Sequence, residues 1–295
     1  MKPSRLLLVL AVLLAVLPPA RAQIAVAISI RQRLFILHEP ILATVSVTNQ
    51  TGRDITLADT RQGQWFSFQV GSEGDHFVPP RDPDYHVPPL ALRAGETLKR
   101  TVNLSELYAL GDFGIYRVRA NIYFAETDKY FSSKPTHIEI TEGRAMWRRT
   151  AGVPDGAKNA GQTHVFTILA HQHGEQNLLY VRVEDQEHGT VFCTTPLGRI
   201  IDGVPPEFQF DSANNLYVLQ LIAQRSFVLS KIGVNGEFLG LAHYSAPKTR
   251  PSLRKLADGT LQIIGGKRDT PIAQNTADLP PPPKLSDRPA GLPRN

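Results

Sequence analysis

Histidines are the side chains of this sequence whose spacing comes nearest to a metal site. Four of the nine lie within one stretch: His164, His171, His173 and His188. Nearby carboxylates belong to Glu175, Glu184, Asp185 and Glu187. On a strand, His171 and His173 would place both rings on one face, as a pair of metal ligands requires. The spacing matches no structural zinc pattern, and Gly174 indicates a polar hairpin end instead. We therefore predict no metal ion, with His171 and His173 as the candidates if one binds.

A proline-bounded loop is the best candidate for a recognition surface. Pro79-Pro80 and Pro88-Pro89 enclose acidic, aromatic and imidazole side chains, namely Asp82, Asp84, Tyr85 and His86. Prolines stiffen a loop, and a tyrosine on such a loop can anchor a partner. The alternative is a solvated loop without a ligand.

An aromatic side chain flanked by arginines forms the second candidate patch. Trp147 precedes Arg148 and Arg149, and Arg144 lies just upstream. Cation–π or stacking contacts would suit a ligand-facing patch. The alternative is that Trp147 packs at a domain junction with solvated arginines around it.

Catalytic motifs are absent from the sequence. It has no Gly-x-Ser-x-Gly elbow, no His-Glu-x-x-His helix and no phosphate-binding glycine loop. Cys193, the one cysteine, lies in the apolar run Val191-Phe192-Cys193, where we expect a small buried hydrophobe. We therefore predict a non-enzyme without a cofactor.

The first 22 residues have the pattern of an export signal. Lys2 and Arg5 precede the apolar run 6–17, and Ala20-Arg21-Ala22 has small residues at the cleavage positions. The run is too short for a membrane span, which needs about 20 residues. We predict cleavage before Gln23, a secreted or periplasmic location, and no transmembrane segment in the mature chain. A single cysteine allows no internal disulfide.

Cleavage would also change the charge. The whole chain has 32 basic and 27 acidic residues, and three basic but no acidic residues lie in 1–22. The mature chain would then carry 29 basic against 27 acidic residues, a net charge of +2. This near-neutral balance, without a basic run, argues against nucleic-acid binding.

Residues 23–140 alternate between apolar and polar in the pattern of half-buried strands. Apolar faces are expected at Ile24/Val26/Ile28/Ile30, at Ile41/Ala43/Val45/Val47, at Phe66/Phe68/Val70 and along the strand that starts at Gly114. Several short strands joined by turns predict an immunoglobulin-like β-sandwich.

The same segment resembles the BsuPI-type proteinase-inhibitor domains. The resemblance rests on the order of four motifs, at 47–52, 63–70, 92–96 and 114–118. It implies an immunoglobulin-like sandwich and, more weakly, proteinase inhibition. These motifs are mostly turn and core residues, so they support the fold more than the function.

The rest of the chain divides into a linker, a repeat region and a tail. Residues 141–163 are rich in Gly and small polar residues toward their end, which predicts a linker. In 164–266, Leu179-Tyr180-Val181 recurs as Leu216-Tyr217-Val218, and turns of the Asn-Gly and Asp-Gly type separate the copies. Residues 267–295 form a proline-rich tail, expected to be disordered.

This period of nearly 40 residues resembles the blades of β-propellers. Residues 164–266 hold two to three units, whereas closed propellers need about four to eight. We therefore predict a small blade-like β domain whose strand edges pair with another chain or with the first domain.

These features together predict an all-β, exported, non-catalytic protein that binds or scaffolds a protein partner. The alternatives are a proteinase inhibitor acting through the sandwich and a hydrolase with an unrecognised site in the repeat domain.

Overall fold

The structure is a computed structural model that describes residues 23–74 and 76–269. The predicted export signal and most of the predicted proline-rich tail lie outside these residues. Contacts within the chain divide it into two compact units. Of the described residues, unit 1 holds 23–146, Leu169–His173 and Cys193–Pro196, and unit 2 holds Trp147–Ile168, Gly174–Phe192 and 197–269.

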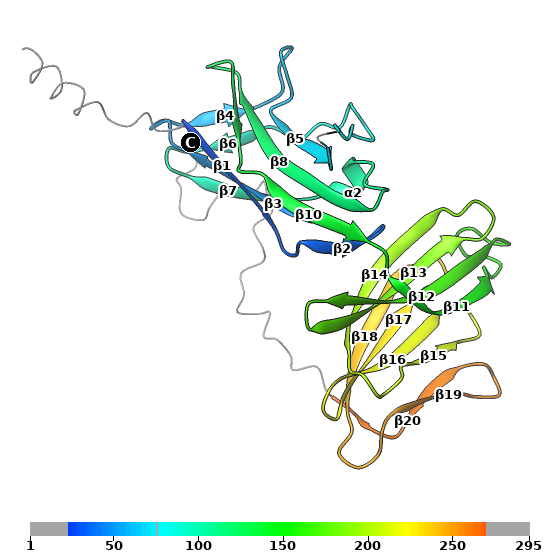
Figure 1. Cartoon of the computed structure of the whole chain (residues 1–295). Coiled ribbons are helices and arrows are strands. Elements are labelled where there is room, and N and C mark those ends of the chain that lie inside the picture. Colours follow the sequence, from blue (N-terminus) through cyan, green and yellow to red (C-terminus); the bar gives the residue numbers. More distant parts are fainter. Residues whose placement is uncertain (1–22, 75, 270–295) are drawn as a thin grey trace, which may run out of the picture. The chain divides into compact units, whose positions relative to one another are not determined.

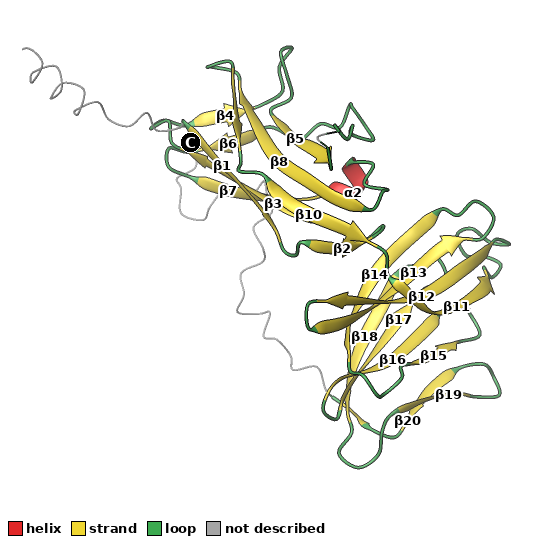
Figure 2. Ribbon diagram, viewed as in Figure 1, coloured by secondary structure: helices red, strands yellow, loops and turns green. Residues whose placement is uncertain are grey.

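Apart from one helical turn, the regular secondary structure of the described chain consists of strands, which confirms the predicted all-β class (Figures 1 and 2). One sheet of unit 1 has the order β1-β3-β7, with strands Ile24–Ile30, Leu42–Asn49 and Thr97–Asn103. The other has the order β2-β10-β8-β5, with strands Leu34–Ile36, Thr136–Thr141, Gly114–Phe124 and Phe66–Ser72. Unit 1 also contains β9 (Lys129–Ser132), which pairs with β8, and one helical turn, α2 (Leu104–Leu107). A separate two-stranded sheet pairs β4 (Ile55–Leu57) with β6 (Leu90–Leu92).

The two sheets of unit 1 share one core, as a sandwich requires. Ala43 and Val45 of β3 and Val118 and Ala120 of β8 are completely buried within the same apolar cluster. The predicted apolar face Phe66/Phe68/Val70 belongs to that cluster too. The alternation of apolar and polar residues predicted these positions correctly, because only one face of each sheet is buried in the core.

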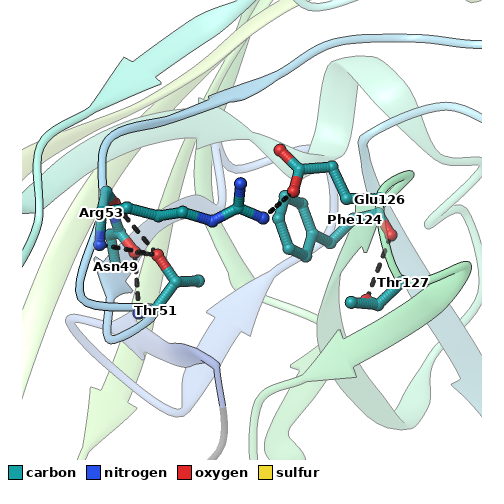
Figure 3. A network of polar contacts seen from close by, with 6 residues as sticks. All are labelled: Asn49, Thr51, Arg53, Phe124, Glu126 and Thr127. Atoms are coloured by element: carbon teal, nitrogen blue, oxygen red, sulfur yellow. Dashed lines mark hydrogen bonds and ion pairs between the residues drawn. The ribbon is translucent and has the colours of Figure 1, made fainter.

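A buried asparagine ties the end of β3 to two neighbouring segments, and Figure 3 shows its contacts with Thr51 and Arg53. The side-chain amide of Asn49 donates to the carbonyl oxygens of Arg53 at 2.6 Å, Leu92 at 3.1 Å and Arg93 at 2.9 Å. Its Oδ1 accepts from the backbone N–H and the hydroxyl of Thr51. Arg53 also pairs with Glu126 across the surface. The sequence Asn49-Gln50-Thr51 matches a glycosylation pattern, but the side-chain amide of Asn49 already donates hydrogen bonds to three backbone carbonyls.

The second half of the chain is built from meanders, in which strands adjacent in sequence are adjacent in the sheet. The first has the order β11-β12-β13-β14, with strands Arg144–Gly152, Thr163–His173, Gln176–Asp185 and Val191–Ile200. The second is the meander β15-β16-β17-β18, with strands Glu207–Phe210, Leu216–Ala223, Ser226–Ile232 and Phe238–Ser245. Strand β21 (Lys267–Arg268), which is not the next strand in sequence, pairs with β18 at the edge of this sheet. A hairpin, β19-β20, follows β18 in sequence, with strands Ser252–Lys255 and Leu261–Ile264.

Two features of this half differ from expectation. Strand β11 lies inside the segment predicted as a linker, where the side chains are mostly exposed and show no alternation. The recurring Leu-Tyr-Val motif lies on β13, third in its sheet, and on β16, second in its sheet. The motif therefore marks a buried central strand and does not mark an equivalent blade position.

Two smaller points complete the fold. Cys193 on β14 is half-buried, less than predicted. Among the described residues, no helix has the length and apolar character to span a bilayer.

Candidate functional site

A pocket of about 170 Å³ opens beside strand β5 of unit 1. Its lining is dominated by aromatic rings and prolines, and it comes from β5, the proline-bounded loop and the end of α2: Gln64, Phe66, Ser67, Phe68, Phe77, Pro80, Asp82, Pro83, Tyr85, Leu107 and Tyr108. Two of the loop residues singled out in the sequence, Asp82 and Tyr85, are among them. Asp84 and His86 are not.

Strand β5 forms the edge of its sheet at this pocket. The carbonyl of Trp65 accepts a hydrogen bond from the N–H of Tyr123, so the backbone groups of Trp65 point toward β8. Because these directions alternate along a strand, the N–H and C=O groups of Phe66, Phe68 and Val70 point away from β8. On that outer side, the carbonyl of Val70 accepts from the N–H of Val78, and the carbonyl of Phe68 accepts from the Tyr108 hydroxyl at 2.9 Å. Among the described strands, none pairs with the outer side of Phe66.

Trp65 fixes the far end of the loop. Its side chain is 1% exposed, and its indole N–H donates to the carbonyl of Val87 at 2.9 Å. Its backbone N–H donates to Oδ1 of Asp59, whose Oδ2 lies 2.7 Å from Nδ1 of His86. His86 therefore holds the loop in place from outside the pocket.

The near end of the loop is tied to α2. The backbone N–H of Arg81 donates to the carbonyl of Leu107, and its guanidinium Nε donates to the carbonyl of Tyr108. The side-chain amide of Gln64 donates to the carbonyl of Pro83 at 3.1 Å. These contacts tie the loop to α2 and to Gln64, just before β5, and the pocket lies among these three segments.

The rim combines exposed aromatic rings with one carboxylate. Phe77 is 63% exposed and Tyr85 is 39% exposed, although rings of this size are stabilised by burial. Asp82 is the charged residue of the lining, and its Oδ1 accepts from the N–H of Asp84. The pocket is therefore apolar inside and acidic at one point of its mouth.

The hydroxyl of Tyr108 at the pocket wall stays protonated. Burial raises its pKa above the usual value, while the bond to Phe68 acts in the opposite direction. A protonated phenol is the form that can donate to a carbonyl. Tyr108 therefore acts as a structural donor here.

The second predicted patch packs within unit 2. The Trp147 ring lies 5.3 Å from that of Phe208 and 5.9 Å from that of Phe210. Arg149 lies over the Trp147 ring, and Arg148 forms an exposed ion pair with Glu184 at 3.0 Å. These contacts stabilise unit 2, and the Trp147 ring packs against the aromatic side chains of β15.

The histidine pair lies at the end of β12, next to the turn at Gly174, as the sequence predicts. Nε2 of His171 and Nδ1 of His173 are buried without a hydrogen-bond partner. Burial, followed by the neighbouring His173, lowers the pKa of His171. Within residues 23–74 and 76–269, no group of three or more His, Cys, Asp or Glu side chains is arranged to hold a metal ion.

Sequence reasoning missed much of the pocket wall. Phe66 and Phe68 were expected in the core, and Phe77, Leu107 and Tyr108 received no role. The available signal was the position of Phe77, two residues before the Pro79-Pro80 pair that begins the loop.

No family model and no curated protein matches this sequence. Among solved structures, the crystal structure of the periplasmic chaperone SfaE is distantly similar to this chain, at 7% sequence identity and a TM-score of 0.22. That similarity covers 74% of this chain and 98% of the chaperone chain.

Proposed function

We propose that this chain is an exported, non-catalytic binding protein whose unit 1 captures an apolar side chain of a protein partner in the pocket beside β5. The observation that carries the proposal is the pocket itself, lined by the rings of Phe66, Phe68, Phe77, Tyr85 and Tyr108. Exposed aromatic rings around a concave apolar surface are typical anchors of protein interfaces. The proline-bounded loop predicted as a recognition surface supplies one wall.

The volume of the pocket favours a single side chain over a whole small molecule. A cavity of about 150 Å³ accepts benzene, whereas pockets for drug-sized ligands measure about 300–1,000 Å³. At about 170 Å³ the pocket fits one phenylalanine or leucine side chain. The rest of the partner would then lie across the rim, over Phe77 and Tyr85.

The proposal is tested by titrating the chain, residues 23–295, with N-acetyl-phenylalaninamide and following its amide and aromatic resonances by NMR. We expect shifts at the pocket residues, and none with N-acetyl-alaninamide. Replacing Leu107 by Trp, which fills the pocket, should remove them. Equal shifts in that variant, or shifts elsewhere only, would contradict the proposal.

A second proposal concerns self-association through the edge of β18. Phe238, Leu239 and Leu241 are each about half exposed, at 48%, 50% and 49%. Among the described strands, β21 pairs with β18 only at Tyr244 and Ser245. An apolar strand edge of this kind favours pairing with a second copy.

Sedimentation of the chain and of its Leu239→Lys/Leu241→Lys variant tests this second proposal. We expect the parent chain to dimerise at micromolar concentration and the variant to stay monomeric. A monomeric parent chain at 100 µM would rule it out.

A further inference from the structure

We infer that the partner offers an extended segment that adds to the edge of β5 at Phe66, with a large apolar side chain in the pocket and a Lys or Arg beside Asp82. The inference rests on the proposed function and specifies its partner: a short strand-like peptide segment. Three features of unit 1 carry it, and each constrains a different part of the segment.

The backbone of Phe66 supplies the first constraint. Its N–H and C=O belong to the outer side of β5, the side on which Phe68 and Val70 use their carbonyls for Tyr108 and Val78. In an antiparallel pair, a residue opposite Phe66 would exchange two hydrogen bonds with it. This is the geometry of strand addition to a sheet edge.

The position of the pocket supplies the second constraint. Side chains of directly opposed residues point to the same face of the sheet. The Phe66 side chain is buried and lines the pocket. The residue opposite Phe66 therefore directs its own side chain into the pocket, so one partner residue supplies both the backbone bonds and the apolar anchor.

The surroundings of Phe66 limit the length of the added strand. Beyond Phe68, the edge is covered because Val78 and His76 bond to Val70 and Ser72. Tyr108 already occupies the carbonyl of Phe68. The partner can therefore pair over only two or three residues, so the pocket and the rim must contribute much of the affinity.

The carboxylate of Asp82 supplies the third constraint. It is the charged residue of the lining, and its Oδ1 is oriented by the N–H of Asp84. Residues two apart on a strand share a face and lie about 6.4–6.8 Å apart. A Lys or Arg two positions from the apolar anchor would reach the mouth of the pocket on the side where its charge is complemented.

The probe is the heptapeptide acetyl-Thr-Thr-Phe-Thr-Lys-Thr-Thr-amide, titrated by calorimetry into the chain 23–295. Replacing Phe by Ala should weaken binding at least about 10-fold, by loss of the buried ring. N-methylating the Phe amide removes one backbone hydrogen bond, and should weaken binding about 3- to 10-fold.

The charge is tested by a matched pair of variants. Replacing the peptide Lys by Glu should weaken binding about 3-fold to the parent chain. The same peptide change should not weaken binding to the Asp82→Asn variant. It should weaken binding to the Asp112→Asn variant as much as to the parent chain, because Asp112 is an exposed carboxylate outside the pocket. An equal penalty in Asp82→Asn would overturn the assignment of the basic residue.

Hydrogen exchange separates strand addition from simple filling of the pocket. The bound peptide should slow exchange of the Phe66 amide, whereas N-acetyl-phenylalaninamide should shift pocket resonances with less protection of that amide. If the peptide binds in the pocket without protecting Phe66, and N-methylation has no effect, strand addition is wrong while the proposed function stands. If neither probe binds at 1 mM, both are wrong.

Discussion

The proline-bounded loop and the histidine pair were both candidate sites in the sequence, but only the loop forms a pocket with other segments of the chain. At the loop, side chains from β5, residues 77–85 and α2 meet around one pocket. At His171 and His173, two rings lie at the end of one strand without a third possible ligand in the described chain. Spacing along a strand places side chains on one face, but a binding site needs several segments to converge.

The convergence at the loop depends on two buried anchors, Trp65 outside the pocket and Tyr108 in its wall. Trp65 and Tyr108 each bond a backbone carbonyl, of Val87 and Phe68 respectively. In the histidine pair, the His171 ring bonds the backbone of Glu142, but one nitrogen of each ring is buried without a hydrogen-bond partner. The following predictions test this difference, beginning with the largest effect.

Trp65→Ala should lower the free energy of unfolding of unit 1 by about 3–5 kcal/mol, because it removes a fully buried ring. It should also abolish binding of the Phe heptapeptide, since Val87 loses its donor and the loop its anchor. Urea unfolding and calorimetry measure the two effects. Trp65→Phe is the matched variant, with a loss of about 1–3 kcal/mol from the unpaired carbonyl. Unchanged peptide binding in Trp65→Ala would break the proposed link between anchor and pocket.

Asn49→Asp should lower the stability of unit 1 by about 2–4 kcal/mol without changing the pocket. The substitution replaces an amide that donates to three carbonyls with a group that repels them. Asn103→Asp, at the half-buried N-cap of α2, is the control and should cost far less. Thermal unfolding of both variants decides the point, and equal losses would contradict the role given to Asn49.

Tyr108→Phe should cost about 1 kcal/mol of stability and leave the Phe68 carbonyl on the open edge. The heptapeptide should bind at least as well as to the parent chain, because one more edge acceptor becomes available. Weaker binding by 10-fold or more would show that the hydroxyl itself contacts the partner.

Acidification should destabilise the region around His171. Burial lowers the folded-state pKa of this side chain below its unfolded value near 6.5, so the unfolded chain binds the proton more readily. The stabilising contribution of the neutral ring is present above pH 6.5 and is lost as the pH falls through the folded-state pKa. Thermal unfolding between pH 7.5 and 5 should therefore show a decline that is smaller in His171→Gln. A steeper decline in the variant would contradict the prediction that protonation of His171 destabilises the folded chain.

Zinc should produce the smallest effect. Structural zinc sites use four protein ligands, and the pair supplies two. Calorimetric titration with zinc should give the same heats for the parent chain and for His171→Ala/His173→Ala. A binding isotherm present only in the parent chain would show that the pair does recruit further ligands.

Alternation accounts for what could be predicted about the fold. Val45, Val70 and Val118 lie where period two placed them, because each sheet has one dry face. Strand β11 escaped prediction because its side chains are mostly exposed and so carry no alternating signal. The parallel pairing of β2 with β10 joins segments about 100 residues apart, and no local pattern specifies such a pair.

The site was predictable only in part for the same reason. Proline and tyrosine composition located the loop, and two of its four named residues reached the pocket. Leu107 and Tyr108 line the opposite wall because α2 follows β7, which is a consequence of the fold and not of any motif. Likewise, the recurring Leu-Tyr-Val motif of the second half predicts a buried strand but does not predict the position of that strand in its sheet.

The most direct test of the central claim is a calorimetric comparison of the two regions with the Phe heptapeptide. The account predicts that Phe77→Ala/Tyr85→Ala weakens binding at least about 10-fold, while His171→Ala/His173→Ala binds as the parent chain does. Equal binding by the parent chain and both variants, or a loss only in the histidine variant, would contradict it.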